Sequence, residues 1–166
     1  MRLNLGCGEQ YADDWHNVDF KSPHRKDETV DLTGELPWPA GSVAQVYAGH
    51  LLEHLTLDEC AALLSRIKTC MVRYGAIMIV GPDVELAEVL QLQGYALEVP
   101  LEQLKYGAGR WAGDEHKWLC TRRQLTDLLQ AAGFKEIVEL SIDQVPRLWP
   151  VAFRGPKWQV GVGGLA

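Results

Sequence analysis

The sequence lacks the features that would place the chain in a membrane or in an oxidising compartment. None of its apolar runs reaches the 18 or more residues of a membrane-spanning helix, and the amino terminus is not a charged segment followed by an apolar run. The four cysteines form no C-x-x-C pair, which excludes a zinc ribbon and is typical of a reducing compartment. We therefore expect a cytoplasmic protein that has no membrane partner.

The sequence also has fewer basic than acidic residues. Sixteen Lys and Arg residues stand against 22 Asp and Glu residues, which gives a net charge of -6. A surface of this sign repels polyanions, so the composition argues against duplex nucleic acid as a partner. A chain of 166 residues with 47% hydrophobic content is long enough for one compact core, and we expect a single domain over residues 1–166.

Short apolar segments alternate with segments of helical spacing. Thr56, followed by Glu59, predicts a capped helix that ends near Gly75, Thr121 predicts another that ends at Gly133, and a third helix is expected over 84–92. The predicted strands are 2–5, 16–20, 29–32, 43–48, 76–80, 135–142 and 158–162. This alternation predicts an α/β fold with a Rossmann-like, seven-stranded, mostly parallel sheet and helices on both faces.

Residues 94–119 show no sustained periodicity and are predicted to form a long excursion over the surface. Elsewhere, small or polar residues follow the predicted strands, where ligands bind in open α/β sheets. These strand-end residues are Gly6-Cys7-Gly8, Asp19, Asp31, Gly49-His50 and Pro82-Asp83. We expect all of them at one rim of the sheet.

The first two of these strand ends suggest a nucleoside site. Glycine at positions 6 and 8 lets a ligand approach the backbone, and a carboxylate at Asp19 can accept hydrogen bonds from the two hydroxyls of a ribose. A dinucleotide fingerprint would need a third glycine where the chain has Tyr11, so a dinucleotide is disfavoured.

Taken together and in order, these motifs resemble the class I S-adenosylmethionine (SAM)-dependent methyltransferases, particularly short bacterial and phage members. The motifs are Leu3-Asn4-Leu5-Gly6-Cys7-Gly8, Trp15-His16-Asn17-Val18-Asp19, Val30-Asp31-Leu32, Leu36-Pro37-Trp38-Pro39, Ala48-Gly49-His50-Leu51-Leu52-Glu53-His54-Leu55, Val80-Gly81-Pro82-Asp83, Asp114-Glu115-His116-Lys117 and Ala132-Gly133-Phe134. The resemblance implies that the last strand is antiparallel, that the excursion lies on the substrate side, and that SAM is the cofactor and S-adenosylhomocysteine (SAH) the product.

The resemblance also implies roles for individual positions. It puts the methionine part of SAM against the loop Gly6–Gly8, the ribose on Asp19, and the adenine beside Asp31-Leu32. The full set that it assigns to cofactor binding is Asn4, Leu5, Gly6, Cys7, Gly8, Asp19, Phe20, Asp31, Leu32, Gly49 and His50. It implies no metal ligand.

A general base is needed when the methyl acceptor carries a proton. His50, Glu53 and His116 are the expected catalytic residues, and His54 is a weaker candidate. The chain lacks both the Asp/Asn-Pro-Pro-Tyr/Phe motif of amino-directed nucleic-acid methyltransferases and the Pro-Cys nucleophile of cytosine carbon-5 transfer. We therefore expect a small-molecule or saccharide acceptor.

Two alternatives stay open on the sequence. Residues 50–54 match H-x-x-E-H, in which two histidines hold zinc and the glutamate activates water in a zinc hydrolase. The chain also fits a cofactor-binding pseudoenzyme that serves as a partner subunit, because Gln45 stands where many methyltransferases carry aspartate. An open pocket of this kind is also compatible with a homodimer.

Overall fold

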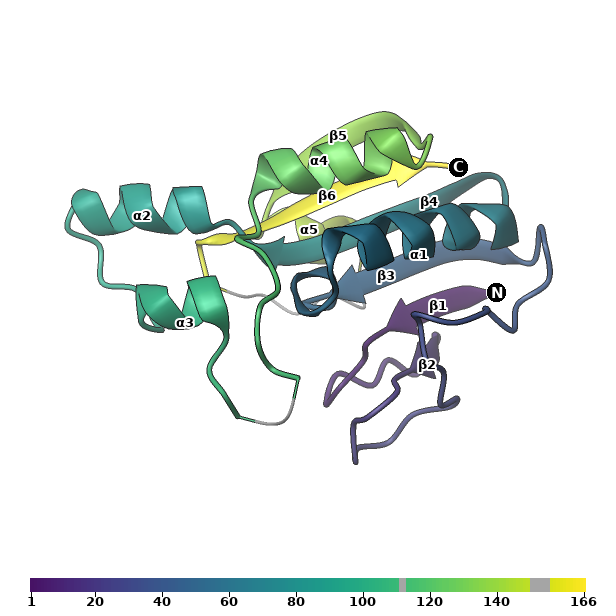
Figure 1. Ribbon diagram of the computed structural model, residues 1–166. Helices are drawn as coiled ribbons and strands as arrows, with labels where there is room; N and C mark the ends of the chain where they lie inside the picture. The colour runs from purple at the N-terminus through teal and green to yellow at the C-terminus, as the bar shows by residue number, and fades with distance from the viewer. Residues whose placement is uncertain (111–112, 150–155) are drawn as a thin grey trace.

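The computed structural model describes residues 1–110, 113–149 and 156–166. Its centre is a mixed sheet with the strand order β2-β1-β3-β4-β6-β5 (Figure 1). The strands are β1 (Arg2–Leu5), β2 (His16–Val18), β3 (Val43–Gly49), β4 (Met71–Pro82), β5 (Lys135–Ser141) and β6 (Gln159–Leu165). The first four are parallel, and β6 runs antiparallel to both of its neighbours, as expected for the last strand.

The strand expected over 29–32 does not form, so the described residues contain six strands rather than seven. The chain contacts β2 just before this segment, through an isolated bridge between Val18 and Glu28. It then turns, because the carboxylate of Asp31 accepts hydrogen bonds from the amide and the hydroxyl of Thr33. A side chain that bonds its own backbone in this way competes with strand pairing. Val30 is nevertheless buried in the core, which explains the apolar pattern that suggested a strand.

The predicted helices are present, with one shifted boundary. Helix α1 (Leu57–Cys70) ends five residues before Gly75, and β4 begins immediately at Met71. The pairing of β4 with β3 is irregular there: Met71 pairs with Val43, and regular pairing resumes at Ala76. Tyr74, inside this irregularity, has φ 62°, so the chain bends before it enters the buried part of the strand. Helices α2 (Val84–Leu92) and α4 (Arg122–Ala131) lie where they were expected.

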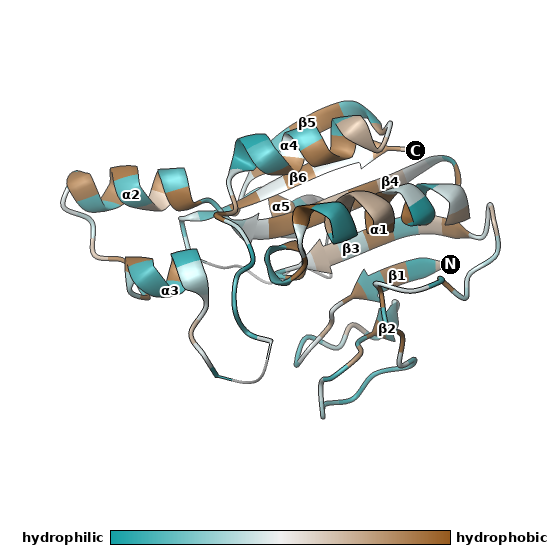
Figure 2. Cartoon of the chain, in the orientation of Figure 1, coloured by the Kyte–Doolittle hydropathy of each residue, from teal (hydrophilic) through white to brown (hydrophobic). Residues whose placement is uncertain are grey.

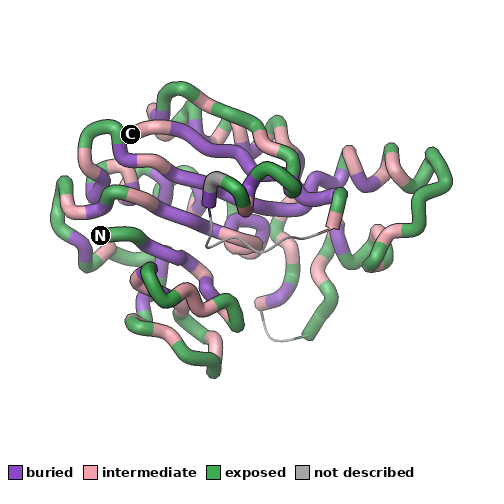
Figure 3. Tube along the Cα trace, turned by 180° about the vertical axis from the view of Figure 1, so that it is seen from behind, coloured by how far each residue is buried: buried purple, intermediate pink, exposed green. Residues whose placement is uncertain are grey.

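Helices α1 and α4 cover one face of the sheet, and the single turn α5 (Val145–Leu148) lies on the other (Figure 1). Hydrophobic and hydrophilic residues alternate along α1 and α4 (Figure 2), and their apolar sides form the larger core with β1, β3, β4 and β6. A smaller core on the second face includes Trp15, Tyr47, Met78, Val145 and Trp149. From behind, most of the length of β3, β4 and β6 is buried (Figure 3). The core therefore holds the carboxyl ends of β1, β3 and β4 in fixed positions.

The excursion begins after α2 and contains a short helix, α3 (Leu101–Tyr106). Both α2 and α3 extend beyond the carboxyl end of β4 (Figure 1). Residues 111 and 112 of the excursion lie outside the described residues. None of the helices in the described ranges is long and apolar enough to cross a membrane.

The capping box at the start of α1 was predicted from the sequence, and a substitution tests how much it stabilises the protein. Thr56 accepts a hydrogen bond from the amide of Glu59, and the Glu59 carboxylate accepts one from the amide of Thr56. Replacing Thr56 by Ala should lower the free energy of unfolding by about 1 kcal/mol, because one helix amide loses its acceptor. Urea denaturation measures the change.

Thr69→Ala is the matched control in the same helix. Thr69 is exposed, and its hydroxyl only donates to the carbonyl of Ser65 within the helix. Its replacement should change the unfolding free energy by less than about 0.5 kcal/mol. An equal loss in both variants would contradict a specific contribution of the capping box.

Candidate functional site at the strand ends

The loop that follows β1 is open toward solvent above Gly8. Gly6 and Gly8 both have positive φ, 63° and 51°. A Cβ atom on Gly6 would come within 3.0 Å of the Leu51 side chain, whereas a Cβ atom on Gly8 would meet no atom within 4 Å. Gly6 is therefore needed for packing, and Gly8 leaves space in which a ligand can approach the backbone.

Asp19, which directly follows β2, lies beside this loop. One carboxylate oxygen accepts a hydrogen bond of 3.0 Å from the amide of Gly8. The other accepts bonds from the amides of Lys21 and Ser22, at 3.0 and 2.8 Å. A carboxylate has about four lone-pair positions, so Asp19 can hold the loop and still accept a bond from a ligand hydroxyl. The structure thus brings the predicted methionine and ribose positions together.

Three of the residues predicted to bind the cofactor are buried where the loop joins β1. Leu5 is part of the core, and Asn4 is buried, with its amide donating to the carbonyl of Gln10 and to the Asn17 side chain. Cys7 is also buried, and its backbone amide donates to the carbonyl of Val18. Burial and the nearby charge of Asp19 raise the pKa of the Cys7 thiol to about 11, so this thiol stays protonated at neutral pH.

The residues predicted to border adenine are more dispersed. Phe20 is 51% exposed beside Asp19, and Asp31 is exposed with its carboxylate turned to Thr33. The side chain of Leu32 is buried in the core, and its carbonyl accepts a hydrogen bond from Arg66 of α1. The Leu32 side chain is therefore not available to a ligand, and the adenine contacts stay a prediction.

His50 follows β3 in a strained conformation. Its φ is 52°, a region that residues other than glycine seldom occupy. Its ring Nδ1 lies 3.1 Å from a carboxylate oxygen of Glu53, and its Nε2 lies 2.7 Å from the side-chain nitrogen of Gln159. Because a carboxylate can only accept, Nδ1 donates to Glu53 and Nε2 carries the lone pair. Gly49, the residue before His50, has no room for a side chain, because a Cβ atom on it would lie 2.7 Å from the Tyr47 hydroxyl.

Glu53 is almost fully buried, at 1% exposure. Burial raises the pKa of its carboxyl group, but the hydrogen bond from His50 and the electrostatic interaction with His50 and His54 outweigh burial and hold the pKa below its usual value. Glu53 is therefore an ionised carboxylate that accepts a hydrogen bond from the His50 ring. Such a carboxylate fixes the tautomer and the ring orientation of a histidine.

The end of the excursion docks directly on this segment. The indole N–H of Trp118 is shared between the carbonyls of Leu52 and Leu55, at 3.1 and 3.0 Å, and the amide of Lys117 donates to the carbonyl of Glu53 at 2.7 Å. The first two carbonyls bound the short 3-10 helix η1 (Leu52–His54), and that of Leu52 also accepts a bond from the amide of Leu55. The excursion and the strand ends are thus joined by direct bonds.

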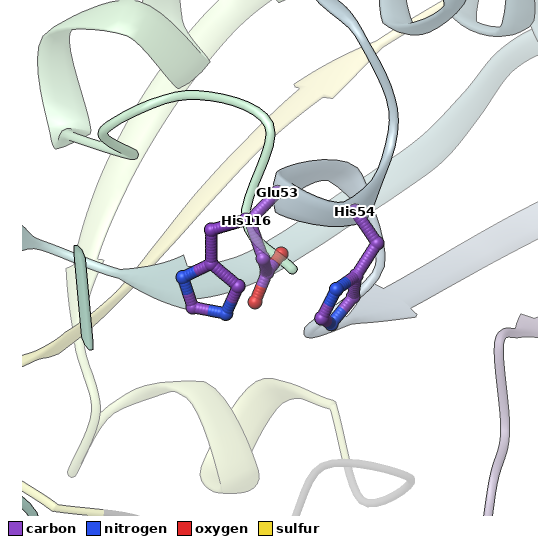
Figure 4. Close-up of side chains that lie close together, drawn as sticks. All are labelled: Glu53, His54 and His116. Atoms are coloured by element: carbon purple, nitrogen blue, oxygen red, sulfur yellow. The ribbon is translucent and has the colours of Figure 1, made fainter. Parts of the chain in front are cut away.

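This docking brings His116 of the excursion against His54 of η1. Their ring centroids are 5.1 Å apart, with the rings edge to face at 72° (Figure 4). His116 donates from Nδ1 to the carbonyl of Leu104 at 2.8 Å, and burial lowers the pKa of its ring. The neighbouring Asp114 is buried and accepts a bond from the amide of Arg110 at 2.9 Å.

The three predicted catalytic residues therefore lie in one cluster, but not as the H-x-x-E-H alternative requires. In that pattern both histidines lie on one face of an α-helix. Here His50 precedes η1 and contacts Glu53 and Gln159, whereas His54 turns toward His116. A zinc hydrolase with His50 and His54 as paired ligands is not supported.

Sequence reasoning missed Gln159. This buried residue is 109 positions from His50 and reaches it only because the start of β6 pairs antiparallel with Pro82 at the end of β4. A single polar residue at the start of an apolar strand was the only available signal, and it does not identify a partner.

A shallow hollow of about 720 Å³ lies elsewhere, at the amino ends of β1, β2 and β3. It is lined by Met1, Arg2, Tyr11, Asp13, Asp14, Trp15, His16, Asp27, Ala44 and Gln45. This hollow is wide open and contains none of the residues clustered around Glu53. We place the site at the carboxyl ends, because the glycine loop, Asp19 and the buried His50–Glu53 pair all lie there.

No protein-family model matches the sequence, and no curated protein is significantly similar to it. Solved structures are similar in fold. A SAM-dependent methyltransferase of Archaeoglobus fulgidus is 16% identical, with a TM-score of 0.65, and the match covers 99% of this chain and 85% of that one. A Nostoc punctiforme protein assigned to the O-methyltransferases is 14% identical, with a TM-score of 0.62 and coverage of 99% and 51%.

A third similar structure is phosphoethanolamine N-methyltransferase 2 of Haemonchus contortus, crystallised with phosphomonomethylethanolamine and SAH. It is 13% identical, with a TM-score of 0.56 and coverage of 99% of this chain and 48% of that one. The chain spans about half the length of the Nostoc and Haemonchus proteins. It has the fold of the SAM-dependent methyltransferases, as the resemblance implied, and these structures give no support to a zinc hydrolase or to a non-catalytic partner subunit.

Proposed function

We propose that this protein transfers a methyl group from SAM to a small-molecule or saccharide acceptor. The observation that carries the proposal is the contact between the Gly8 amide and the Asp19 carboxylate at the carboxyl ends of β1 and β2. This contact supports the proposal, because it joins an open stretch of backbone to a carboxylate that can accept hydrogen bonds from ribose hydroxyls, at the edge of the sheet where ligands bind in this fold.

The residues present fit this cofactor. The space above Gly8 is free of protein atoms to 4 Å, and Asp19 retains acceptor capacity next to it. SAM supplies an activated methyl group on a positively charged sulfur. The chain carries net negative charge, and Asp19 adds an anionic group beside the proposed position of the cofactor. The sign of the charge thus favours a cationic ligand.

Methyl transfer needs alignment and a place for the acceptor proton more than covalent participation by the protein. The bond from sulfur to methyl breaks as a bond from the acceptor oxygen or nitrogen to methyl forms, and the acceptor proton leaves. His50 is the base we propose, with Nε2 taking the proton in place of its bond from Gln159 and Glu53 stabilising the charged ring. The ring is 30% exposed, so an acceptor has access to it.

The acceptor class is proposed from charge and from missing motifs. A net charge of -6 disfavours a polyanionic acceptor, and the motifs of amino-directed and cytosine-directed nucleic-acid enzymes are absent. A hydroxyl or amine of a small molecule or saccharide needs only a base such as His50.

The glycine loop is tested with a matched pair of variants. Gly8 and Gly41 both have positive φ, 51° and 70°, and a Cβ atom on either would meet no atom within 4 Å. Replacing either with Ala should therefore cost a similar 1–2 kcal/mol or so of backbone strain. Gly8→Ala should also weaken SAH binding at least tenfold in calorimetric titration, because the methyl group occupies the ligand's space.

Gly41→Ala should leave SAH affinity within about threefold of the wild type. Equal SAH affinity in Gly8→Ala and Gly41→Ala would show that the cofactor does not bind at the loop after β1.

The base is tested by replacing His50 with Ala. Turnover, followed as SAH release with a panel of hydroxylated small molecules and saccharides, should fall by about 10² to 10⁴. SAH affinity should stay within about threefold, because the ring is assigned to the acceptor rather than the cofactor. His16→Ala is the control, since His16 also pairs with a carboxylate, Glu28, at 2.9 Å but lies at the amino end of β2. A parallel loss of turnover and SAH affinity in His50→Ala would make His50 structural.

A further inference from the structure

Three donor side chains of the kind that bind transition metals converge beside His50. Glu53 and His54 belong to η1, and His116 comes from the excursion more than 60 residues later. One potential ligand atom from each lies within 4.8 Å of the other two, and the three side chains point toward one another (Figure 4). We propose that Glu53, His54 and His116 bind one divalent transition-metal ion, of which zinc is the probe of choice.

The donor set has the chemistry of such sites. Two imidazoles and one carboxylate are a common three-ligand set for Zn²⁺ and Fe²⁺, and they leave at least one coordination position open. Four zinc ligands at 2.0–2.1 Å are about 3.4 Å apart, so the most distant pair here must close by at most about 1.4 Å. Side-chain rotation alone can supply a movement of this size.

Backbone carbonyls set the tautomers of both imidazoles. His116 Nδ1 lies 2.8 Å from the carbonyl of Leu104, and His54 Nδ1 lies 3.4 Å from that of Glu115, which is a weaker contact. A carbonyl can only accept, so each Nδ1 that bonds one carries the hydrogen, and Nε2 carries the lone pair. A metal-bound histidine makes the same outer bond from its second nitrogen.

The carboxylate has an electrostatic reason to bind a cation. Glu53 is buried at 1% exposure and receives one side-chain hydrogen bond, of 3.1 Å, from His50. Removing a carboxylate from water is unfavourable unless several donors or a positive charge compensate it. A divalent ion held by His54 and His116 would supply that charge on the side of Glu53 away from the core.

The protein holds the two segments together without the ion. The bonds from Trp118 to Leu52 and Leu55, and from Lys117 to Glu53, fix the excursion against η1. The proposed site is therefore preorganised by hydrogen bonds from the excursion to backbone carbonyls of residues 52–55. It differs from the H-x-x-E-H pattern, because His50 supports Glu53 from behind and is not a ligand.

An ion at this position would have a use in the proposed reaction. Its open coordination position would lie in the same cluster as His50, and a hydroxyl bound there would lose its proton more readily. This second step rests on the proposed function, whereas metal binding does not. The two are separable by measuring zinc and SAH independently.

The test uses the full chain, treated with a chelator and then titrated with Zn²⁺ in competition with a chromophoric chelator. The wild type should bind one equivalent. His54→Gln and His116→Gln should each weaken zinc binding at least tenfold while circular dichroism shows an unchanged fold. His24→Gln is the control, because His24 also faces a carboxylate, Glu9 at 3.3 Å, but lies outside the cluster.

Several outcomes would overturn the site. They are no stoichiometric zinc in the wild type, equal weakening in His24→Gln, or full affinity in His116→Gln together with loss in His50→Gln. The Co²⁺-loaded protein should show absorption bands of nitrogen and oxygen ligation, and a thiolate charge-transfer band would mean binding by a cysteine instead. SAH titration of the same samples reports on the proposed function separately, since SAH binding without zinc would overturn only the metal site.

Discussion

The indole of Trp118 makes the contact on which the site depends. Its single N–H is shared by the carbonyls of Leu52 and Leu55 at the two ends of the 3-10 helix η1, and it adds to the bond that Leu52 already accepts from the amide of Leu55. The same contact ties the excursion to the end of β3. Glu53 of η1 and His116 of the excursion therefore share one cluster, although the chain between them leaves the sheet and returns.

The rest of the site is built from strand ends that the core fixes. Parallel pairing of β1 with β2 and β3 sets Gly8 beside Asp19 and places His50 at the same rim. Antiparallel pairing of β6 with β4 then delivers Gln159 to the ring of His50. Asp19, His50 and Gln159 thus lie at the ends of strands, where packing sets their positions. His116 lies in the excursion and is positioned by its hydrogen bond to Leu104 and by the docking of the neighbouring Trp118.

Local signals in the sequence predicted much of this fold and failed where long-range contacts decide. The Thr56–Glu59 capping box located the start of α1, because both partners lie within one turn. The expected strand at 29–32 was wrong, since the Asp31–Thr33 bonds form a turn that apolar spacing does not reveal. Gln159 and the pairing of His54 with His116 were not predictable, because each depends on how distant segments dock.

The central claim is that SAM binds between the loop after β1 and Asp19, and a pair of aspartates tests it most directly. Asp27, like Asp19, accepts three hydrogen bonds near β2, from the amide and side chain of Asn17 and from the Tyr11 hydroxyl, but none of these bonds involves Gly8. The measurement is calorimetric titration of Asp19→Ala and Asp27→Ala with SAH. The account predicts at least tenfold weaker binding in Asp19→Ala and a change within about threefold in Asp27→Ala. Equal affinities, or a wild type that does not bind SAH, would contradict it.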